Sequence, residues 1–351
     1  MVDWLILSRP SNKKQTSAEE EAGRSSGRDL PTPEILQPTL DPALASYRPR
    51  LSRKLTKHLR GACADTMPAL VRLWIAGFKK YYPNIEIEVP PPFDGPFGAK
   101  ELANGNLDFT VISRVLRPEE VAAFQSKFGY DPLSVPVSIG SYRHFGFLDA
   151  MGFFVNKDNP LERISFDQLD AMLARTHHRG SPPITTWGQL GLTGEWADKP
   201  IHIYGIKPWD GIEALIRERV LNYDGKRGEW RADINFDSVF NTARRVNGDR
   251  YGFGYTGLSY IDAGVRVLAL GESANGPFYA PTYENVALNR YPLNRVIFFN
   301  ANRPPTKPLD PVLAEFLSFI LSREGQQIVR DHAVFLPLSA AQAANSQTLL
   351  Q

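Results

Sequence analysis

The stretch ADTMPALVRLWIAGFKKYYPNIEIEV, residues 64–89, combines the two kinds of segment that recur along this chain. Its first part repeats apolar side chains at the spacing of a helix that turns one face toward a core. Its last part, IEIEV, alternates apolar and acidic residues as a half-buried strand does. The stretch therefore predicts a helix followed directly by a strand. The apolar stripe of the helix consists of Met67, Leu70, Val71, Trp74 and Phe78.

The turn before this helix, ACADTMP at residues 62–68, is built from small and polar residues. Asp65 or Thr66 is expected to cap the helix, and Pro68 is compatible with its first turn. The first N–H groups of a helix have no partner inside it, and together with the helix dipole they favour an anion. This helix start is therefore a candidate position for an anionic group.

Strand-like and helix-like segments alternate from about residue 55 onward. This alternation predicts α/β layers with mostly parallel sheets. The chain has 351 residues, of which 42% are hydrophobic, and this length allows two or three domains. The clearest expected strands lie at residues 85–89, 107–113, 201–206 and 295–300, and the clearest helices at 118–128, 165–174, 211–221 and 310–332.

The N-terminal part differs in composition from the rest. It is polar, charged and Pro-containing and shows no apolar period, so residues 1–54 are predicted to be disordered. The segment VDWLIL at residues 2–7 is too short for the apolar centre of a signal peptide, and Asp3 stands where a basic flank is expected. This chain therefore shows no export signal.

Several classes of function find no support in the sequence. The formal net charge of +2 gives no footprint for nucleic acid or a membrane, and no apolar run approaches the ~20 residues of a membrane helix. Cys63 is the only cysteine, and we expect a packed thiol rather than a nucleophile. No zinc spacing, P-loop or nucleophile-elbow motif is present. We therefore expect no enzyme activity, no metal, no cofactor and no nucleic-acid partner.

Three junctions between strand and helix could contribute to an anion site, at residues 62–68, 93–102 and 207–215. Ser113 and Arg114, at the end of a predicted strand, could add a hydroxyl group and a cation. A structural role is the alternative for each, because a capped helix start needs no ligand and an arginine is often exposed or salt-bridged.

The order of these segments resembles that of the phosphate-type solute-binding proteins of ABC transporters, which have the periplasmic-binding-protein fold. YPLNR at residues 291–295 and FILSREGQ at residues 319–326 are fairly specific to this family, and the likeness covers residues 55–340. The matching stretches are residues 64–89, 102–140, 153–173, 185–205, 252–260, 291–305 and 309–329.

The resemblance implies a two-lobed α/β fold of type II, hinged by two crossover strands, with the ligand between the lobes. The crossover strands would lie near GFFVN at residues 152–156 and YTGLSY at residues 255–260. The implied division is a disordered segment at 1–54, a first lobe at 55–148 with 263–340, a second lobe at 149–262, and a C-terminal tail at 341–351.

The resemblance also implies ligand-binding residues. Thr66 matches the hydroxyl and amide at the first helix start, with the N–H of Met67 beside it, and Ser113 matches a hydroxyl after the third strand, with Arg114 beside it. The implied ligand-binding set is Asp65, Thr66, Met67, Gly95, Ser113, Arg114, Asp210 and Gly211.

Other positions depart from the family pattern. The loop DGPFG at residues 94–98 replaces a hydroxyl-rich run, and its proline removes a donor. Ile206 stands where the family has Arg, Asp210 where it has Ser and Ile212 where it has Thr, and only Gly211 is kept. We therefore expect weak or absent binding of phosphate, and the ligand could instead be another oxyanion or a polar solute.

Three functions follow from these observations. The first is an extracytoplasmic solute-binding protein that works with an ABC permease as a monomer and is periplasmic by resemblance. The second is a degenerate binding-protein domain that serves as a scaffold or interaction module. The third, a hydrolase of phosphate esters, lacks both a nucleophile–base pair and a metal set.

Overall fold

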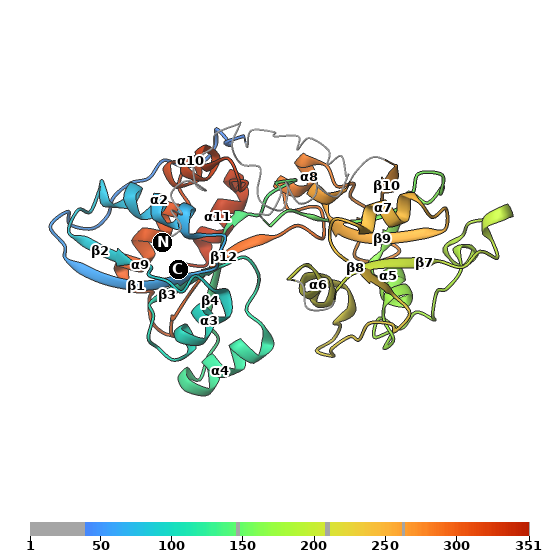
Figure 1. Cartoon of the computed structure of the whole chain (residues 1–351). Coiled ribbons are helices and arrows are strands. Elements are labelled where there is room, and N and C mark those ends of the chain that lie inside the picture. Colours follow the sequence, from blue (N-terminus) through green and yellow to red (C-terminus); the bar gives the residue numbers. More distant parts are fainter. Residues whose placement is uncertain (1–38, 145–147, 208–210, 262–263, 351) are drawn as a thin grey trace. The chain divides into compact units, whose positions relative to one another are not determined.

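The computed structural model describes residues 39–144, 148–207, 211–261 and 264–350. In these ranges the chain forms two compact units, and each unit contains its own five-stranded sheet (Figure 1). The first unit takes residues 36–141 and 295–351, and the second takes residues 142–294, as far as they are described. The chain therefore passes between the units twice.

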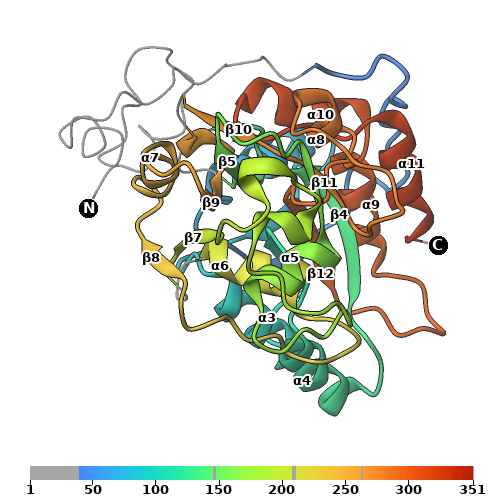
Figure 2. The same cartoon turned by 90° about the vertical axis from the view of Figure 1, so that its right-hand side faces the viewer.

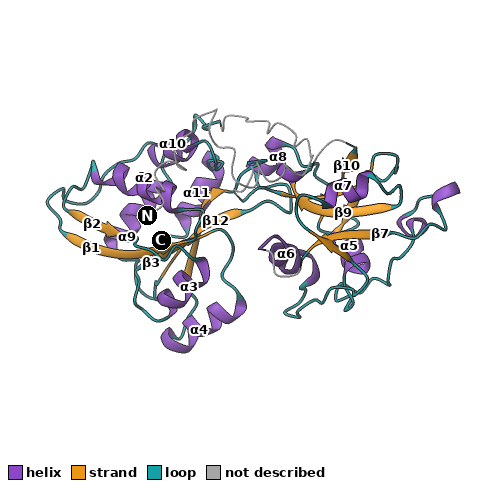
Figure 3. Ribbon diagram, viewed as in Figure 1, coloured by secondary structure: helices purple, strands orange, loops and turns teal. Residues whose placement is uncertain are grey.

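The strands of the first unit form one mixed sheet (Figure 3). They are β1 (Lys57–Cys63), β2 (Ile85–Glu88), β3 (Phe109–Ile112), β4 (Leu133–Ile139) and β12 (Val296–Ala301). Their order in space is β2-β1-β3-β12-β4. β1 runs parallel to both β2 and β3, whereas β12 runs antiparallel to both β3 and β4. All residues of β3 are buried, as expected for a strand that is covered on both faces.

Helices cover both faces of this sheet. They are α2 (Pro68–Lys79), α3 (Gly95–Ala103), α4 (Pro118–Phe128), α9 (Pro311–Ile320), α10 (Arg323–His332) and α11 (Ala340–Thr348). Phe109 and Thr110 are neighbours on β3 and so point to opposite faces. Phe109 contacts Phe316 of α9, whereas Thr110 lies against Gly98 of α3. Figure 2 accordingly shows α3 and α4 together, apart from α9, α10 and α11.

The second unit repeats this design with a sheet in the order β10-β5-β9-β7-β8 and a small pair, β6 and β11. The strands are β5 (Met151–Asn156), β6 (Arg163–Ser165), β7 (His202–Ile206), β8 (Asn235–Asp237), β9 (Gly252–Gly257), β10 (Val265–Val267) and β11 (Ala269–Gly271). The helices are α5 (Phe166–Leu173), α6 (Gly211–Ile216), α7 (Thr242–Asn247) and α8 (Tyr283–Ala287), with short turns η1 (Trp187–Leu190), η2 (Gly194–Trp196), η3 (Arg217–Leu221) and η4 (Leu258–Tyr260). In the five-stranded sheet β7 runs parallel to both β8 and β9, and β5 is antiparallel to both β9 and β10. The small pair β6 and β11 is parallel.

The expected fold class is confirmed, since both units are α/β. The expectation of mostly parallel sheets holds only for three adjacent strands of each five-stranded sheet, β2-β1-β3 and β9-β7-β8. The glycine-rich segment at residues 252–257 is the buried strand β9. A Cβ atom at Gly254 would lie 2.8 Å from the Phe154 ring, so backbone crowding explains this glycine. Within the described ranges, no helix combines the length and apolar character that crossing a bilayer requires.

The structure divides the chain at other places than the sequence suggested. β10 pairs with β5, and Tyr291 donates a hydrogen bond of 2.7 Å to the Met151 carbonyl, so residues 264–294 belong to the second unit rather than to the first. The expected crossovers at residues 152–156 and 255–260 lie within β5, β9 and η4 of the second unit. The reason is that strand partners, which no local pattern reveals, decide where a unit ends.

The prediction of disorder is wrong for residues 39–54, while residues 1–38 lie outside the described ranges. Leu44 and Tyr47 are buried against the first unit. The carboxylate of Asp41 accepts a hydrogen bond from the Ala340 amide at 2.8 Å, and the Arg323 amide donates to the Ala45 carbonyl at 2.8 Å. This segment is therefore fastened across α10 and the start of α11. The expected C-terminal tail is also structured, because most of it forms α11.

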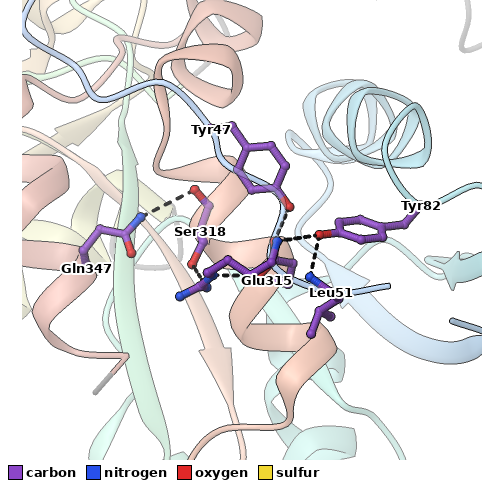
Figure 4. Close-up of polar contacts among 7 residues, drawn as sticks. Tyr47, Leu51, Tyr82, Glu315, Ser318 and Gln347 are labelled. Atoms are coloured by element: carbon purple, nitrogen blue, oxygen red, sulfur yellow. Dashed lines mark hydrogen bonds and ion pairs between the residues drawn. The ribbon is translucent and has the colours of Figure 1, made fainter. Parts of the chain in front are cut away.

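A buried carboxylate holds this segment in place (Figure 4). Glu315 of α9 is 1% exposed and accepts hydrogen bonds from the Tyr47 and Tyr82 hydroxyls at 2.6 and 2.8 Å. It also accepts from the amide N–H and the guanidinium Nε of Arg50, both at 2.9 Å. Burial by itself would raise the pKa of Glu315, but these hydrogen bonds and the charge of Arg50 outweigh it and keep the pKa below its ordinary value of 4.5. We call this group the Glu315 clamp.

We predict that Tyr47→Phe lowers the free energy of unfolding by about 2 kcal/mol, because it removes a hydrogen bond to a buried charge. The matched control is Tyr81→Phe, whose ring contacts Tyr47 and Phe319 but whose hydroxyl bonds to no described residue. Urea unfolding of both variants measures the difference. Equal effects of the two substitutions would show that the hydroxyl bond contributes nothing.

The clamp also predicts an acid dependence. A carboxyl whose pKa is lowered by folding stabilises the protein above its unfolded pKa, near 4.5, and this contribution is lost as the pH falls through the folded pKa. Glu315→Gln should therefore cost more stability at neutral pH than at about pH 3.5. Urea titrations at both pH values test this, with the exposed Glu119→Gln on α4 as control. A cost independent of pH would contradict the prediction.

Candidate functional site

The candidate site lies at one edge of the first sheet. Because β1, β2 and β3 are parallel, their carboxyl ends reach the same edge, and the segments that follow them lead into α2, α3 and α4. A Cβ atom at Gly95, the first residue of α3, would lie 3.5 Å from Ile112 Cγ2 and 3.9 Å from the Ala64 Cβ. The start of α3 therefore lies against the ends of β1 and β3. In open α/β sheets, this edge is where ligands bind.

Four residues of the predicted set are brought to neighbouring segments at this edge. Asp65 and Thr66 follow β1, Gly95 begins α3, and Ser113 follows β3. Asp65 is exposed, and the other three are partly exposed. Their proximity agrees with the sequence expectation, and their role in binding stays a prediction.

Thr66 carries the clearest sign of an unfilled interaction. Its hydroxyl oxygen Oγ1 is buried and has no hydrogen-bond partner among the described residues. Buried polar groups are usually paired, so an unpaired one calls for an explanation, and a ligand atom is one such explanation. The hydroxyl of Ser113 likewise makes no hydrogen bond to a described residue. Two hydroxyl groups are thus available at this edge.

The backbone at the start of α2 is less available than the sequence suggested. The Thr66 amide donates to Asp65 Oδ1 at 2.9 Å, and the Met67 amide donates to the Ala64 carbonyl at 3.0 Å. The expectation that Met67 offers its N–H to a ligand is therefore wrong in this structure. The expectation of a side-chain cap is wrong as well, because Met67 is the N-cap residue and no side chain bonds to the helix start. The Asp65 carboxylate binds the neighbouring amide instead.

Two other amides of α2 remain. Pro68 has no N–H, and the N–H groups of Ala69 and Leu70 have no acceptor in the described part of the chain. The start of α3 has fewer free N–H groups, because the Phe97 amide donates to Asp94 Oδ1 at 2.6 Å and Pro96 has no N–H. The start of α2 is therefore the better donor of backbone N–H groups.

The cation of Arg114 is committed to the chain itself. Its guanidinium makes two hydrogen bonds of 2.7 Å to the two carboxylate oxygens of Glu120, in the bidentate geometry that binds strongly. It also donates to the Val115 carbonyl at 2.9 Å. The side chains of Arg114 and Glu120 are only 18% and 12% exposed. The salt-bridged alternative is therefore the one that the structure shows, and the pair fixes the segment that follows Ser113.

The second unit adds little that can be described. Asp210 lies outside the described residues, and Gly211 is the first residue of α6. Ile206, the position at which the family has Arg, ends β7 and is 1% exposed, so it belongs to the core. Sequence reasoning missed the buried Glu213, which Arg217 binds at 2.8 Å and to which the Trp230 ring N–H also donates.

The spacing of Glu213 and Arg217, four residues apart on one helix, is the signal that could have revealed this pair. Because such a pair stabilises its own helical segment, a structural role is sufficient for both residues.

Cys63 is fully buried, and burial raises the pKa of its thiol to about 12, so it is the packed thiol that we expected. In the part of the chain that is described, no three His, Cys, Asp or Glu side chains gather as metal ligands would.

Comparisons with known proteins agree with this architecture. A family model described as a PBP superfamily domain matches residues 48–324. The phosphate-binding protein PstS of Pseudomonas aeruginosa is 32% identical over 308 residues, which cover 87% of this chain and 90% of that protein. Protein SphX of Synechococcus elongatus is 28% identical over 274 residues, or 77% of this chain and 75% of that protein.

Solved structures show the same fold. PstS from Borrelia burgdorferi covers 81% of this chain and 99% of its own, with a TM-score of 0.57 and 19% identity. An ABC-type phosphate transport receptor from Vibrio cholerae covers 80% of this chain and 99% of its own, with a TM-score of 0.53 and 15% identity. At these identities, the likeness concerns the fold alone.

The packing at this edge can be tested with two glycines of α3. A Cβ atom at Gly98 would lie 2.3 Å from Thr110 Oγ1, so we predict that Gly98→Ala lowers the free energy of unfolding by about 1–3 kcal/mol. Gly95→Ala meets only ordinary contacts and should change it by less than about 0.5 kcal/mol. Thermal unfolding measures both, and equal effects would mean that α3 does not press on β3 as described.

Proposed function

Because this chain belongs to the PBP superfamily and, within it, to the phosphate-type solute-binding proteins of ABC transporters, we propose that it is the solute-binding subunit of an importer. The protein acts as a monomer on the outer side of the cytoplasmic membrane. It binds a phosphate-type oxyanion or a related polar solute there and delivers this ligand to the permease in the membrane. The named function of PstS, the relative with 32% identity, supports this class of ligand.

One observation in the structure carries the proposal. The buried Thr66 Oγ1 has no partner, and it lies at the start of α2, on the segment next to Gly95 and Ser113. A hydroxyl, the free amides of the first turn and the positive end of the helix dipole together suit a tetrahedral oxyanion. These groups bind and orient a ligand, and they contain no nucleophile paired with a base. A binding role therefore explains them better than an enzymatic one.

The same contacts support weak binding of phosphate. The amides of Thr66 and Met67 bond within the chain, and Arg114 is neutralised by Glu120. Each missing charge-assisted hydrogen bond costs about 1.5–3 kcal/mol of the binding free energy. Loss of two such bonds is enough to move a submicromolar affinity toward the millimolar range. At this edge of its sheet the first unit thus offers an oxyanion two hydroxyls and few amides, while Arg114 is held by Glu120.

A second function, a degenerate binding-protein domain that serves as an interaction module, is favoured by one observation. The amides of Thr66 and Met67 and the Arg114 side chain already have partners inside the chain, so these three groups need no ligand. The two functions differ in whether any small anion binds at this edge.

Calorimetry with inorganic phosphate distinguishes them. We expect a dissociation constant above about 1 μM, which corresponds to a binding free energy of about −8 kcal/mol or weaker. Thr66→Val should weaken it about tenfold, and Ser113→Ala should weaken it as well, because each removes a hydrogen-bonding hydroxyl. The controls are Thr56→Val and Ser126→Ala, which change exposed residues away from this edge.

Submicromolar binding of phosphate would overturn the claim of a weakened site. Heats that are absent for phosphate, sulfate and arsenate alike would favour the interaction module. Native mass spectrometry of freshly purified protein then identifies any other solute that it carries.

A further inference from the structure

The first unit displays a concentration of positive charge that the overall net charge conceals. Residues 48–60, RPRLSRKLTKHLR, contain six Lys and Arg residues and no Asp or Glu. Two more, Lys79 and Lys80, end α2. All eight residues are exposed to solvent.

Six of these side chains make no ion pair with a described carboxylate, namely Arg60 and five others that we call the basic cluster. They are Arg48, Arg53, Lys54, Lys79 and Lys80. Arginines elsewhere in the chain are commonly paired, as in Arg114–Glu120 and Arg231–Asp233. An unpaired group of like charges is repulsive, so a folded protein gains nothing from it unless a partner supplies the counter-charge.

The chain brings the members of the basic cluster together from two segments. The amides of Arg50 and Leu51 donate to the Tyr82 hydroxyl at 3.1 and 3.2 Å, and the Tyr47 ring contacts the Tyr81 ring with centroids 4.9 Å apart. Residues 48–51 therefore lie beside the end of α2, where the two lysines are.

The loop that carries the remaining two cations is fixed at both ends. Leu51 is held by Tyr82, and Lys57 is paired with Ile85 across β1 and β2, so Arg53 and Lys54 must lie near the segment between Tyr82 and Ile85. The Glu315 clamp anchors the whole arrangement to α9 (Figure 4). The cluster is thus presented by a rigid support.

Most carboxylates near this loop are already engaged. Glu315 is buried and paired with Arg50, and Asp310 is paired with Lys57 at 3.1 Å. Glu88 of β2 binds His58 at 3.3 Å, while Glu86 lies opposite His58 in the strand pairing. Lys79 also complements the negative end of the α2 dipole, but the dipole gives no reason for the cations of residues 48–54.

We propose that the basic cluster docks this protein on an anionic phospholipid surface. Lysine and arginine side chains next to a bilayer are attracted to anionic headgroups, and several together give reversible association. Leu55, 36% exposed, stands in the same loop and adds an apolar contact at the headgroup boundary. A single-stranded nucleic acid fits less well, because it needs exposed aromatic rings for stacking, and Tyr47 and Tyr82 are buried.

The test uses the full chain and vesicles of phosphatidylcholine that contain about one third phosphatidylglycerol. We expect cosedimentation with these vesicles, little with pure phosphatidylcholine, and release at about 0.5 M salt. The variant with Arg48→Gln, Arg53→Gln and Lys54→Gln should bind at least about tenfold more weakly. Independently, Lys79→Gln with Lys80→Gln should weaken binding too.

A control of equal charge change carries Lys226→Gln, Arg227→Gln and Arg244→Gln, which alter exposed cations of the second unit that pair with no described carboxylate. It should bind vesicles like the unchanged protein. Unchanged binding by the cluster variants, equal loss in the control, equal binding to neutral vesicles, or binding only to an oligonucleotide would overturn the proposal. Phosphate calorimetry on the same variants reports on the candidate site separately, so failure of one proposal leaves the other standing.

Discussion

The parallel pairing of β1 with both β2 and β3 is the constraint on which the first unit depends. Parallel neighbours cannot be joined by a tight turn, so the chain must return along the sheet, and it does so as α2 and α3. These helices bury the sheet. The same geometry places three strand ends and the helix starts that follow them at one edge, so the core and the candidate site have a common origin.

At that edge, ligand and chain compete for the same donors. Asp65 and Asp94 each accept from a backbone amide one or three residues ahead, which costs little entropy because the partners are close in sequence. Such local bonds remain whether or not a ligand is present. The hydroxyls of Thr66 and Ser113 have no partner among the described residues, and the proposed binding of an oxyanion therefore rests mainly on them.

Charge is used in two different ways in the first unit. Glu315 and Glu120 each hold several donors, and each fixes a segment that would otherwise be free to move. The basic cluster has no such partner, yet it stands on the segment that Glu315 holds. A buried network thus gives a fixed position to charges that face the solvent.

Local pattern was a good guide wherever the structure is itself local. α4 begins and ends as predicted, α5 lies within the helix predicted at residues 165–174, and the apolar stripe of α2 is buried, because periodicity involves residues a few positions apart. The sequence by itself determined the α/β class, the elements with a clear apolar period and the family. Only the tertiary structure decided the limits of the two units and the fixed position of residues 39–54. It also decided that Arg114 pairs with Glu120 and that the Met67 amide donates to the Ala64 carbonyl. Those outcomes depend on which strands pair and on which acceptor lies within hydrogen-bond distance of each donor in the folded chain. The spacing of side chains along the sequence predicts neither.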